Sequence, residues 1–254
     1  MLTAITRAVS PAINQCELTY QQREPIDVDR AHRQHQAYVA LLAELGARVI
    51  PLPAEPALPD SMFVEDPVVV VDEIAVITRM GALSRRPEAE SMARALEPYR
   101  RLHWMCEPAT LEGGDVLRLG RRLFAGLSPR TNAAGIAQLG EALQAFGYTV
   151  EPVELRGCMH LKSGCSALAD GVILAHRPWI DERAFAGYQI VDVAPTEPRA
   201  ANVLAIGGTV IMAKCFPETR RIVERLGYPV RTLDVSELMK AESGLTCSSV
   251  LFEA

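Results

Sequence analysis

The sequence predicts an α/β fold in which five ββαβ units close into a ring. The main observation is a repeat in which a polar lead residue introduces two short apolar runs joined by a turn. A second observation is that the chain ends LTAITRAV (2–9) and SSVLFEA (248–254) can pair to complete one unit. The lead residues recur at intervals of 42 to 48 residues and are Glu65, Glu112, His160, Asn202 and Cys247.

Each pair of apolar runs is predicted to form a β-hairpin. The joining residues of the four complete pairs are Asp72-Glu73, Gly120-Arg121, Asp170-Gly171 and Gly207-Gly208. The last two pairs are strong hairpin signals, because they tolerate the positive φ that tight primed turns require.

A helix and a third strand are predicted after the hairpins. The helical segments are 28–46, 87–99, 132–147 and 216–227, with Pro87 in a first turn, Asn132 as N-cap, and Gly46 and Gly147 as terminators. The third strands are 47–52, 103–108, 149–155, 189–194 and 229–235. Closing such units into a ring removes exposed strand edges. An open doubly wound sheet is disfavoured, because hairpins precede the helices and no GxGxxG or P-loop is present.

Composition predicts one domain spanning 1–254, large enough to bury its own core. The 254 residues are 49% hydrophobic, and the proline-rich segment 51–61 is interpreted as an ordered loop. A net charge of −5 with scattered arginines disfavours nucleic acid as a partner. The N-terminus has no long apolar run, so we expect neither a signal peptide nor a membrane span. Six cysteines without a CxxC motif indicate a reduced, cytoplasmic protein.

Two lead residues, Cys247 and His160, form a candidate catalytic pair. Most free cysteines are small buried hydrophobes, and most lone histidines are structural. Their equivalent places in the repeat favour a thiol nucleophile beside an imidazole. Cys158, His160 and Cys165 could instead bind a metal, but their spacing matches no common zinc pattern.

Acidic residues at two leads suggest a cationic ligand. Asp60, Glu65 and Asp66 form one group, and Glu112 and Asp115 form another, beside strands of Val, Ile and Leu where an unpaired carboxylate is costly. A planar guanidinium suits such carboxylates, because it binds two oxygens in a bidentate fork.

Three more residues have two interpretations each. Phe63 either stacks on the cation or packs in the core. Arg85 and Arg130 follow the outer strands of two hairpins in equivalent contexts. They are either ordinary surface arginines or a clamp for the α-carboxylate of an amino acid.

An ordered set of motifs resembles the dimethylarginine dimethylaminohydrolase family, in the guanidine-modifying superfamily that also holds arginine deiminases and amidinotransferases. The set spans nearly the whole chain in order and is highly specific. The resemblance implies a five-bladed α/β propeller, the pentein fold. The motifs are PDSMFVEDP (59–67), ITRMGALSRR (77–86), EGGDV (112–116), SPRTN (128–132), HLKSG (160–164), AANVL (200–204) and LTCSSV (245–250).

The resemblance implies that Cys247 attacks the guanidinium carbon of the substrate. His160 then protonates the departing amine and activates the water that hydrolyses the thiouronium intermediate, and Glu112 holds the guanidinium nitrogens. No metal or organic cofactor is implied. The resemblance implies substrate contacts by Leu18 in a mobile loop, by the acidic Asp60, Glu65 and Asp66, and by Arg85 and Arg130 at the α-carboxylate. Phe63 is a further candidate for substrate binding, from its residue type alone.

The expected activity is hydrolysis of Nω-methylated arginine to citrulline and methylamine or dimethylamine. Ser248 stands where some relatives have a second cysteine, and the chain is shorter than arginine deiminases and amidinotransferases. Another guanidino compound such as free arginine stays open as substrate, since the lid segment 12–27 varies in the superfamily.

Two rival functions are disfavoured. Retention of Glu112, His160 and Cys247 together argues against a non-catalytic binding module. The C-terminal place of Cys247 argues against a papain-like protease, whose nucleophile opens an early helix. The oligomeric state, a homodimer included, is not determined by the sequence.

Overall fold

The computed structural model describes residues 1–254 and holds fifteen strands and six α-helices. The strands are β1 Leu2–Arg7, β2 Arg48–Leu52, β3 Val68–Val70, β4 Ile74–Ile77, β5 Arg101–Trp104, β6 Val116–Leu119, β7 Arg122–Leu127, β8 Thr149–Glu154, β9 Cys165–Ala169, β10 Val172–Ala175, β11 Gln189–Asp192, β12 Leu204–Ile206, β13 Thr209–Ala213, β14 Val230–Leu233 and β15 Val250–Glu253. The helices are α1 Val28–Glu44, α2 Glu88–Leu96, α3 Ala133–Gln144, α4 Leu161–Gly164, α5 Pro217–Arg225 and α6 Ser236–Met239.

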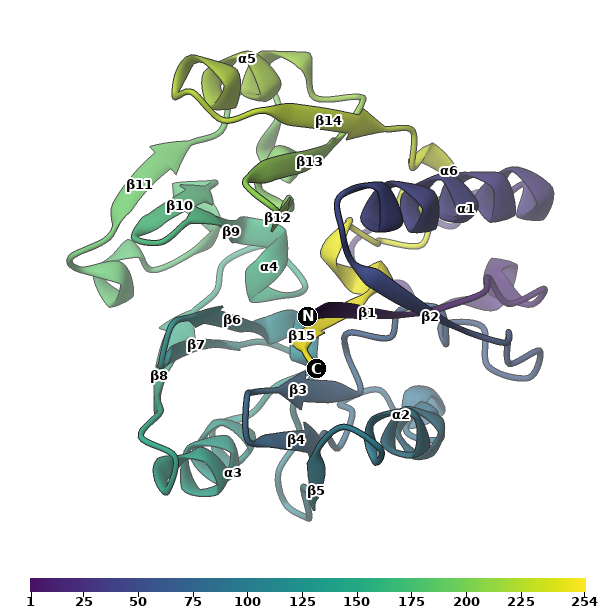
Figure 1. Ribbon diagram of the computed structural model, residues 1–254, viewed down its shortest axis with the longest axis vertical. Coiled ribbons are helices and arrows are strands. Elements are labelled where there is room, and N and C mark those ends of the chain that lie inside the picture. The colour runs from purple at the N-terminus through teal and green to yellow at the C-terminus, as the bar shows by residue number, and fades with distance from the viewer.

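Five three-stranded sheets surround a common centre (Figure 1). In each sheet an antiparallel hairpin is followed by a third strand that runs parallel to the second, as in β6–β7–β8. The longer helices lie at the periphery, whereas α4 lies near the centre (Figure 1). The predicted ring of five ββαβ-type repeats is therefore confirmed.

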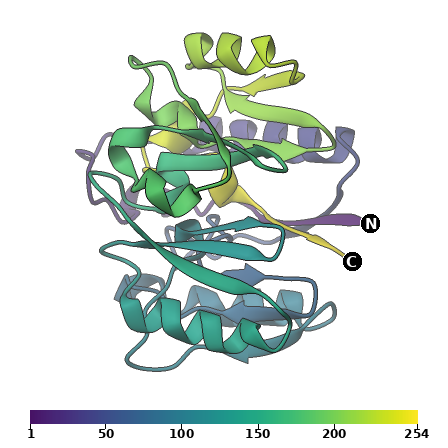
Figure 2. The same cartoon turned by 90° about the vertical axis from the view of Figure 1, so that its left-hand side faces the viewer.

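The ring is closed by the two ends of the chain. Strand β1 pairs with β15 antiparallel, so that Leu2 lies opposite Glu253, and with β2 in parallel. The N-terminal ammonium group also donates to the Ala254 carbonyl oxygen at 3.0 Å. Figure 2 shows both termini projecting from the same side of the molecule. One sheet is thus shared by the first and last segments, as predicted.

Local sequence signals fix the turns and helix ends. Gly207 and Gly208 both have positive φ, +57° and +75°, which a two-residue primed turn requires. The Asn132 side chain accepts the Gly135 amide at 2.7 Å and so caps α3. Gly147, with φ +76°, ends the segment that follows this helix.

Two local predictions differ from the structure. The third strand of the second sheet was expected at 103–108 and lies instead at Arg101–Trp104, because Cys106 begins a turn whose carbonyl accepts the Ala109 amide. The repeat pattern predicts a helix after every hairpin, but the fourth unit holds two short 3₁₀ turns, Arg177–Trp179 and Glu182–Phe185. The connection between β10 and β11 spans 176–188 and is shorter than the 214–229 connection that holds α5, and it forms only these two turns.

The hydrophobic core is divided among neighbouring sheets. In one cluster Phe124 of β7 packs on Phe185 and Tyr188 of the next unit, with ring centroids 4.6 and 5.7 Å apart. The largest cluster joins Tyr38 of α1 to Ile211 of β13. Packing between units therefore holds the inner strand ends in place. None of the helices combines the length and apolar character needed to span a bilayer.

Candidate active site

The five lead loops, defined as the segments just before β3, β6, β9, β12 and β15, meet at the centre of the ring. Hydrogen bonds join them in a closed circuit. The bonds run from the Glu65 amide to the Cys247 carbonyl (3.3 Å), from the Gly113 amide to the Asp66 carbonyl (2.8 Å), from the Leu161 amide to Asp115 Oδ1 (2.9 Å), from Asn202 Nδ2 to the Lys162 carbonyl (2.8 Å) and from the Leu245 amide to Asn202 Oδ1 (2.6 Å). Residues that are distant in sequence are thereby held at one place.

A buried ion pair lies within this circuit. His160 Nε2 is 2.9 Å from Glu112 Oε2, and both side chains are almost fully buried. Burial lowers the pKa of His160, but Asp115, Asp66 and Glu112 outweigh it and raise that pKa to about 9. Burial likewise raises the pKa of Glu112, and the imidazole more than offsets this. The pair is therefore an imidazolium and a carboxylate at neutral pH.

The Nδ1 face of His160 is closely packed against Gly114. A Cβ at this glycine would lie 2.7 Å from His160 Nδ1 and 2.7 Å from Asp66 Oδ1. The Gly114 amide also donates to Asp66 Oδ1 at 3.1 Å. Only a residue without a side chain fits between the imidazole and the Asp66 carboxylate.

Arg85 is buried beneath Asp66. Its guanidinium donates to Asp66 Oδ2 at 2.7 Å and to both oxygens of Glu88 at 3.0 and 2.8 Å. It also donates to the Phe63 carbonyl at 3.3 Å and lies 6.0 Å from the Phe63 ring, which belongs to the core. Burial raises the pKa of Glu88, and the nearby Arg85 lowers it. The effect of burial is larger, so the pKa is raised to about 7. Arg85 thus serves as the counter-ion of buried acids, and its contact with a ligand carboxylate stays a prediction.

The predicted lid segment, 12–27, lies against the same centre. The Asp60 carboxylate accepts the Glu17 amide at 3.1 Å, and half-buried Leu18 packs against the core. Arg130 lies 3.7 Å from Glu112 Oε1 and donates to Thr19 Oγ1 at 3.3 Å. Asp60 and Leu18 therefore lie at the lid segment, and Arg130 connects that segment to Glu112.

The lid tip is fastened by one carboxylate. Glu242 accepts the backbone amides of Thr19 at 2.9 Å, Tyr20 at 2.5 Å and Gln21. Glu242 has the left-handed φ of +56°, which is uncommon for a residue with a side chain. This contact closes the lid onto the loop that leads to Cys247.

Cys247 lies in a short 3₁₀ turn, Thr246–Ser248, and is half-buried. Its Sγ accepts the Gly244 amide at 3.5 Å. Burial, followed by the nearby charges of Glu65 and Asp66, raises the pKa of this thiol to about 12. Without a bound cation, the side chain is therefore a neutral thiol at physiological pH.

The acidic cluster already has its own cations. The donor atoms of Asp66, Glu112 and His160 lie within 4.8 Å of one another, and this is the one such group of three potential metal ligands. Arg85 pairs with Asp66, and the imidazolium pairs with Glu112. The alternative set of Cys158, His160 and Cys165 does not form a group, so the zinc interpretation finds no support in the geometry.

Comparisons with known proteins place this arrangement in a family. The family model described as eukaryotic N,N-dimethylarginine dimethylhydrolase matches residues 4–207. A dimethylarginine dimethylaminohydrolase of Streptomyces coelicolor is 37% identical over 97% of this chain and 95% of its own length. A Pseudomonas aeruginosa protein of the same name is 35% identical over 89% of this chain and 90% of its own length. The chain belongs to the dimethylarginine dimethylaminohydrolase family.

Solved structures of this family share the fold. A cysteine-to-serine variant of the Pseudomonas aeruginosa enzyme complexed with citrulline has a TM-score of 0.94 and 32% identity, covering 99% of this chain and all of the other. A dimethylarginine dimethylaminohydrolase solved as an adduct with S-methyl-L-thiocitrulline has a TM-score of 0.93 with the same coverage and identity. The family resemblance and the pentein fold expected from the motifs are both confirmed.

The sequence alone assigns no role to three supporting residues, Lys162, Thr246 and Asn202. Each of them lies in one of the motifs that resemble the dimethylarginine dimethylaminohydrolase family. Lys162 pairs with Glu65, whose other oxygen accepts Thr246 Oγ1 at 2.8 Å. Glu65 is thus satisfied within the protein, and its contact with a ligand stays a prediction. Asn202 was identified only as a repeat position, yet its amide joins the His160 and Cys247 loops.

Asp115 supports the His160 loop from below. This fully buried carboxylate accepts the hydroxyl groups of Ser128 and Thr131, each at 2.6 Å, and the Leu161 amide at 2.9 Å. Burial raises its pKa to about 6, against the effect of His160 and the hydroxyls. An acid directly before β6 could be recognised as structural only once these partners were known.

The raised thiol pKa gives a direct prediction. The thiolate of Cys247 contributes an ultraviolet absorbance that is absent from the Cys247→Ser variant. In the free protein this absorbance should develop only well above neutral pH, because burial and two nearby carboxylates oppose formation of the anion. The difference between wild type and variant removes the contribution of the other cysteines. A Cys247 titration below neutral pH would contradict the electrostatic picture.

Proposed function

We propose that the protein hydrolyses Nω-methylated arginine to citrulline and methylamine or dimethylamine through a covalent intermediate on Cys247. Its family membership and its relatives named dimethylarginine dimethylaminohydrolase support the proposal. So do family structures with citrulline and with a thiocitrulline adduct. The observation that carries it is the buried Glu112–His160 pair held beside the Cys247 loop at the ring centre.

Binding places the substrate guanidinium among acids. Asp66 and Glu112 provide negative charge in a region shielded from water, where a planar cation gains most from two carboxylates. The amino-acid end then extends toward the lid. There Arg130 is available for the α-carboxylate, while Asp60 and Leu18 lie close to the same segment. The closed lid limits the access of bulk water to the reacting atoms.

The bound cation activates the nucleophile. The carboxylates that keep the Cys247 thiol neutral in the free protein are partly neutralised by the guanidinium, so the thiol can lose its proton to solvent. The thiolate Sγ then forms a bond to the guanidinium carbon. The result is a tetrahedral adduct in which the carbon bears sulfur and three nitrogens.

His160 then acts as acid and base in turn. In its imidazolium form it donates a proton to the methylated nitrogen, the carbon–nitrogen bond breaks, and the amine leaves a thiouronium on Cys247. The neutral imidazole next takes a proton from water as the water oxygen adds to the carbon. The carbon–sulfur bond then breaks as the carbonyl forms, the hydroxyl proton passes to the departing thiolate, and citrulline and the Cys247 thiol are released. Overall, one water is consumed and one amine is produced.

Two wider attributes form part of the proposal. Residues 1–254 act as one domain, which is supported by the pairing of β1 with β15 across the chain ends. The enzyme works in the cytoplasm, which is supported by six free cysteines.

The nucleophile is tested by Cys247→Ser. This variant should form no measurable citrulline from dimethylarginine, because the hydroxyl is a far weaker nucleophile here, while still binding the substrate. Cys106→Ser, at an exposed free cysteine, is the matched control and should retain wild-type turnover. The assay measures citrulline and released amine on a panel of mono- and dimethylated arginines and free arginine. Citrulline production by Cys247→Ser would refute the assignment of Cys247 as the nucleophile. Turnover of free arginine alone would show that arginine, rather than a methylated arginine, is the substrate.

The bridge between catalytic loops is tested by Asn202→Ala. Loss of its bonds to the Lys162 carbonyl and to the Leu245 and Thr246 amides should misplace Cys247 and lower kcat by about 10²-fold, with little change in KM. Asn202→Asp keeps the accepting oxygen and should recover part of the rate.

The matched control for that substitution is Asn132→Ala, which removes a helix N-cap away from the centre. It should cost about 1 kcal/mol of unfolding free energy and leave kcat unchanged. A wild-type kcat for Asn202→Ala would show that Asn202 does not position the nucleophile.

A further inference from the structure

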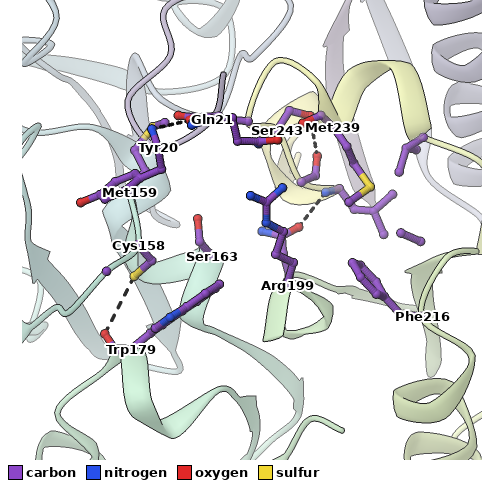
Figure 3. A pocket seen from close by; sticks show the side chains of 17 residues that line it. Tyr20, Gln21, Cys158, Met159, Ser163, Trp179, Arg199, Phe216, Met239 and Ser243 are labelled. Carbon is purple, nitrogen blue, oxygen red and sulfur yellow. Dashed lines mark hydrogen bonds between the residues drawn. The ribbon is translucent and has the colours of Figure 1, made fainter. Parts of the chain in front are cut away.

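A second pocket lies beside the catalytic centre. It is bounded by the lid tip, the loop before α4, the 3₁₀ turn Pro198–Ala201 and the segment from α6 to Leu245 (Figure 3). Its volume of about 130 Å³ is room for roughly ten water-sized groups. Cys247, His160 and Glu112 do not line it, whereas Asn202, which bridges the His160 and Cys247 loops, and Gly244, whose amide donates to Cys247 Sγ, do.

The pocket has apolar walls of a kind that bind flat ligands. Trp179 and Phe216 are half-buried and lie on either side of it in Figure 3, and Tyr20 of the lid is 51% exposed. Met159 and Met239 add polarisable surface that adapts to aromatic rings. Aromatic and methionine side chains around a concavity are typical of small-molecule sites.

The charge available in the pocket is positive. Arg199 lies between Trp179 and Phe216 in Figure 3, is exposed, and makes neither an ion pair nor a hydrogen bond with the protein. The one acid in the lining, Glu242, already accepts backbone amides of the lid. The guanidinium is therefore free for an external anion, and its planar fork matches a carboxylate.

We propose that this pocket is a second binding site, which takes a small aromatic carboxylate. The aromatic ring packs against Trp179, on one side of Arg199, and the carboxylate pairs with the Arg199 guanidinium. A ring with a one-carbon carboxylate arm has about ten non-hydrogen atoms, which agrees with the available volume.

Occupation of this pocket is coupled to the catalytic centre by shared walls. Tyr20 and Gln21 of the lid tip line the pocket, and both donate their backbone amides to Glu242. Ser163 lies in α4, which begins directly after His160, and Leu245 lies two residues before Cys247. A bound ligand therefore stabilises the closed lid and contacts both catalytic loops without entering the active site.

The site is tested by calorimetric titration with phenylacetate. Phenylacetamide, which has the same ring but no charge, tests whether binding depends on the carboxylate. Wild type should bind phenylacetate, and Arg199→Gln should weaken this binding by about 10-fold or more, with Arg199→Lys between them. Phenylacetamide should bind weakly and equally to wild type and Arg199→Gln. Because Arg199 is exposed, Arg199→Gln should keep wild-type turnover of dimethylarginine.

The alternative location is the catalytic centre itself, where Arg130 could attract the same anion. Arg130→Gln should leave phenylacetate binding unchanged, and saturating citrulline should not displace phenylacetate. Equal binding by wild type and Arg199→Gln, loss of binding in Arg130→Gln, competition by citrulline, or no binding to wild type would each overturn the proposal. Repeating the titration on Cys247→Ser separates this result from the proposed hydrolysis, because binding is measured without turnover.

Discussion

The interaction on which the site depends is the pairing of Glu112 with His160 in the buried centre of the ring. Removing a carboxylate and an imidazolium from water costs several kcal/mol per ion, so such a pair contributes little to stability unless its surroundings compensate. Here the surroundings are other charges and fixed amides. Asp66 and Asp115 stabilise the imidazolium, and a closed circuit of hydrogen bonds prevents the loops from separating. Ring closure by β1 and β15 makes this arrangement possible, because it brings five sheets to one point.

In the proposed mechanism, the same charges explain how the Cys247 thiol can be unreactive at rest and reactive once the substrate is bound. Burial together with Glu65 and Asp66 opposes formation of a thiolate at Cys247. These carboxylates also make the centre attractive to a cation. A guanidinium that enters offsets the negative field, so the chemical group to be attacked also favours ionisation of its nucleophile. Selectivity for cationic substrates then follows from electrostatics as well as from shape.

Much of this could be predicted from the sequence, because the repeat carries both fold and site. Even spacing of the lead residues predicts the ring, and it places Glu112, His160 and Cys247 in equivalent loops. What could not be predicted depends on contacts between loops that are distant in sequence. Examples are the burial of Arg85 under two acids and the bridge that Asn202 forms.

Local sequence patterns predict neither the exact bounds of one strand nor the contact that fastens the lid. The strand β5 begins before its most apolar stretch, because pairing with β4 rather than hydrophobicity sets its register. Glu242, an ordinary acid in the sequence, fastens the lid because its backbone takes a left-handed conformation. Neither feature has a signal in composition or spacing.

The central claim is that the reaction proceeds through a covalent bond between Cys247 and the guanidinium carbon. Its most direct test is peptide mass spectrometry on wild-type enzyme quenched in acid during turnover of dimethylarginine. The account predicts that the peptide containing Cys247 gains the mass of the substrate less one dimethylamine, and that the gain disappears when substrate is exhausted. Steady citrulline production with no such adduct, or an adduct on another residue, would contradict it.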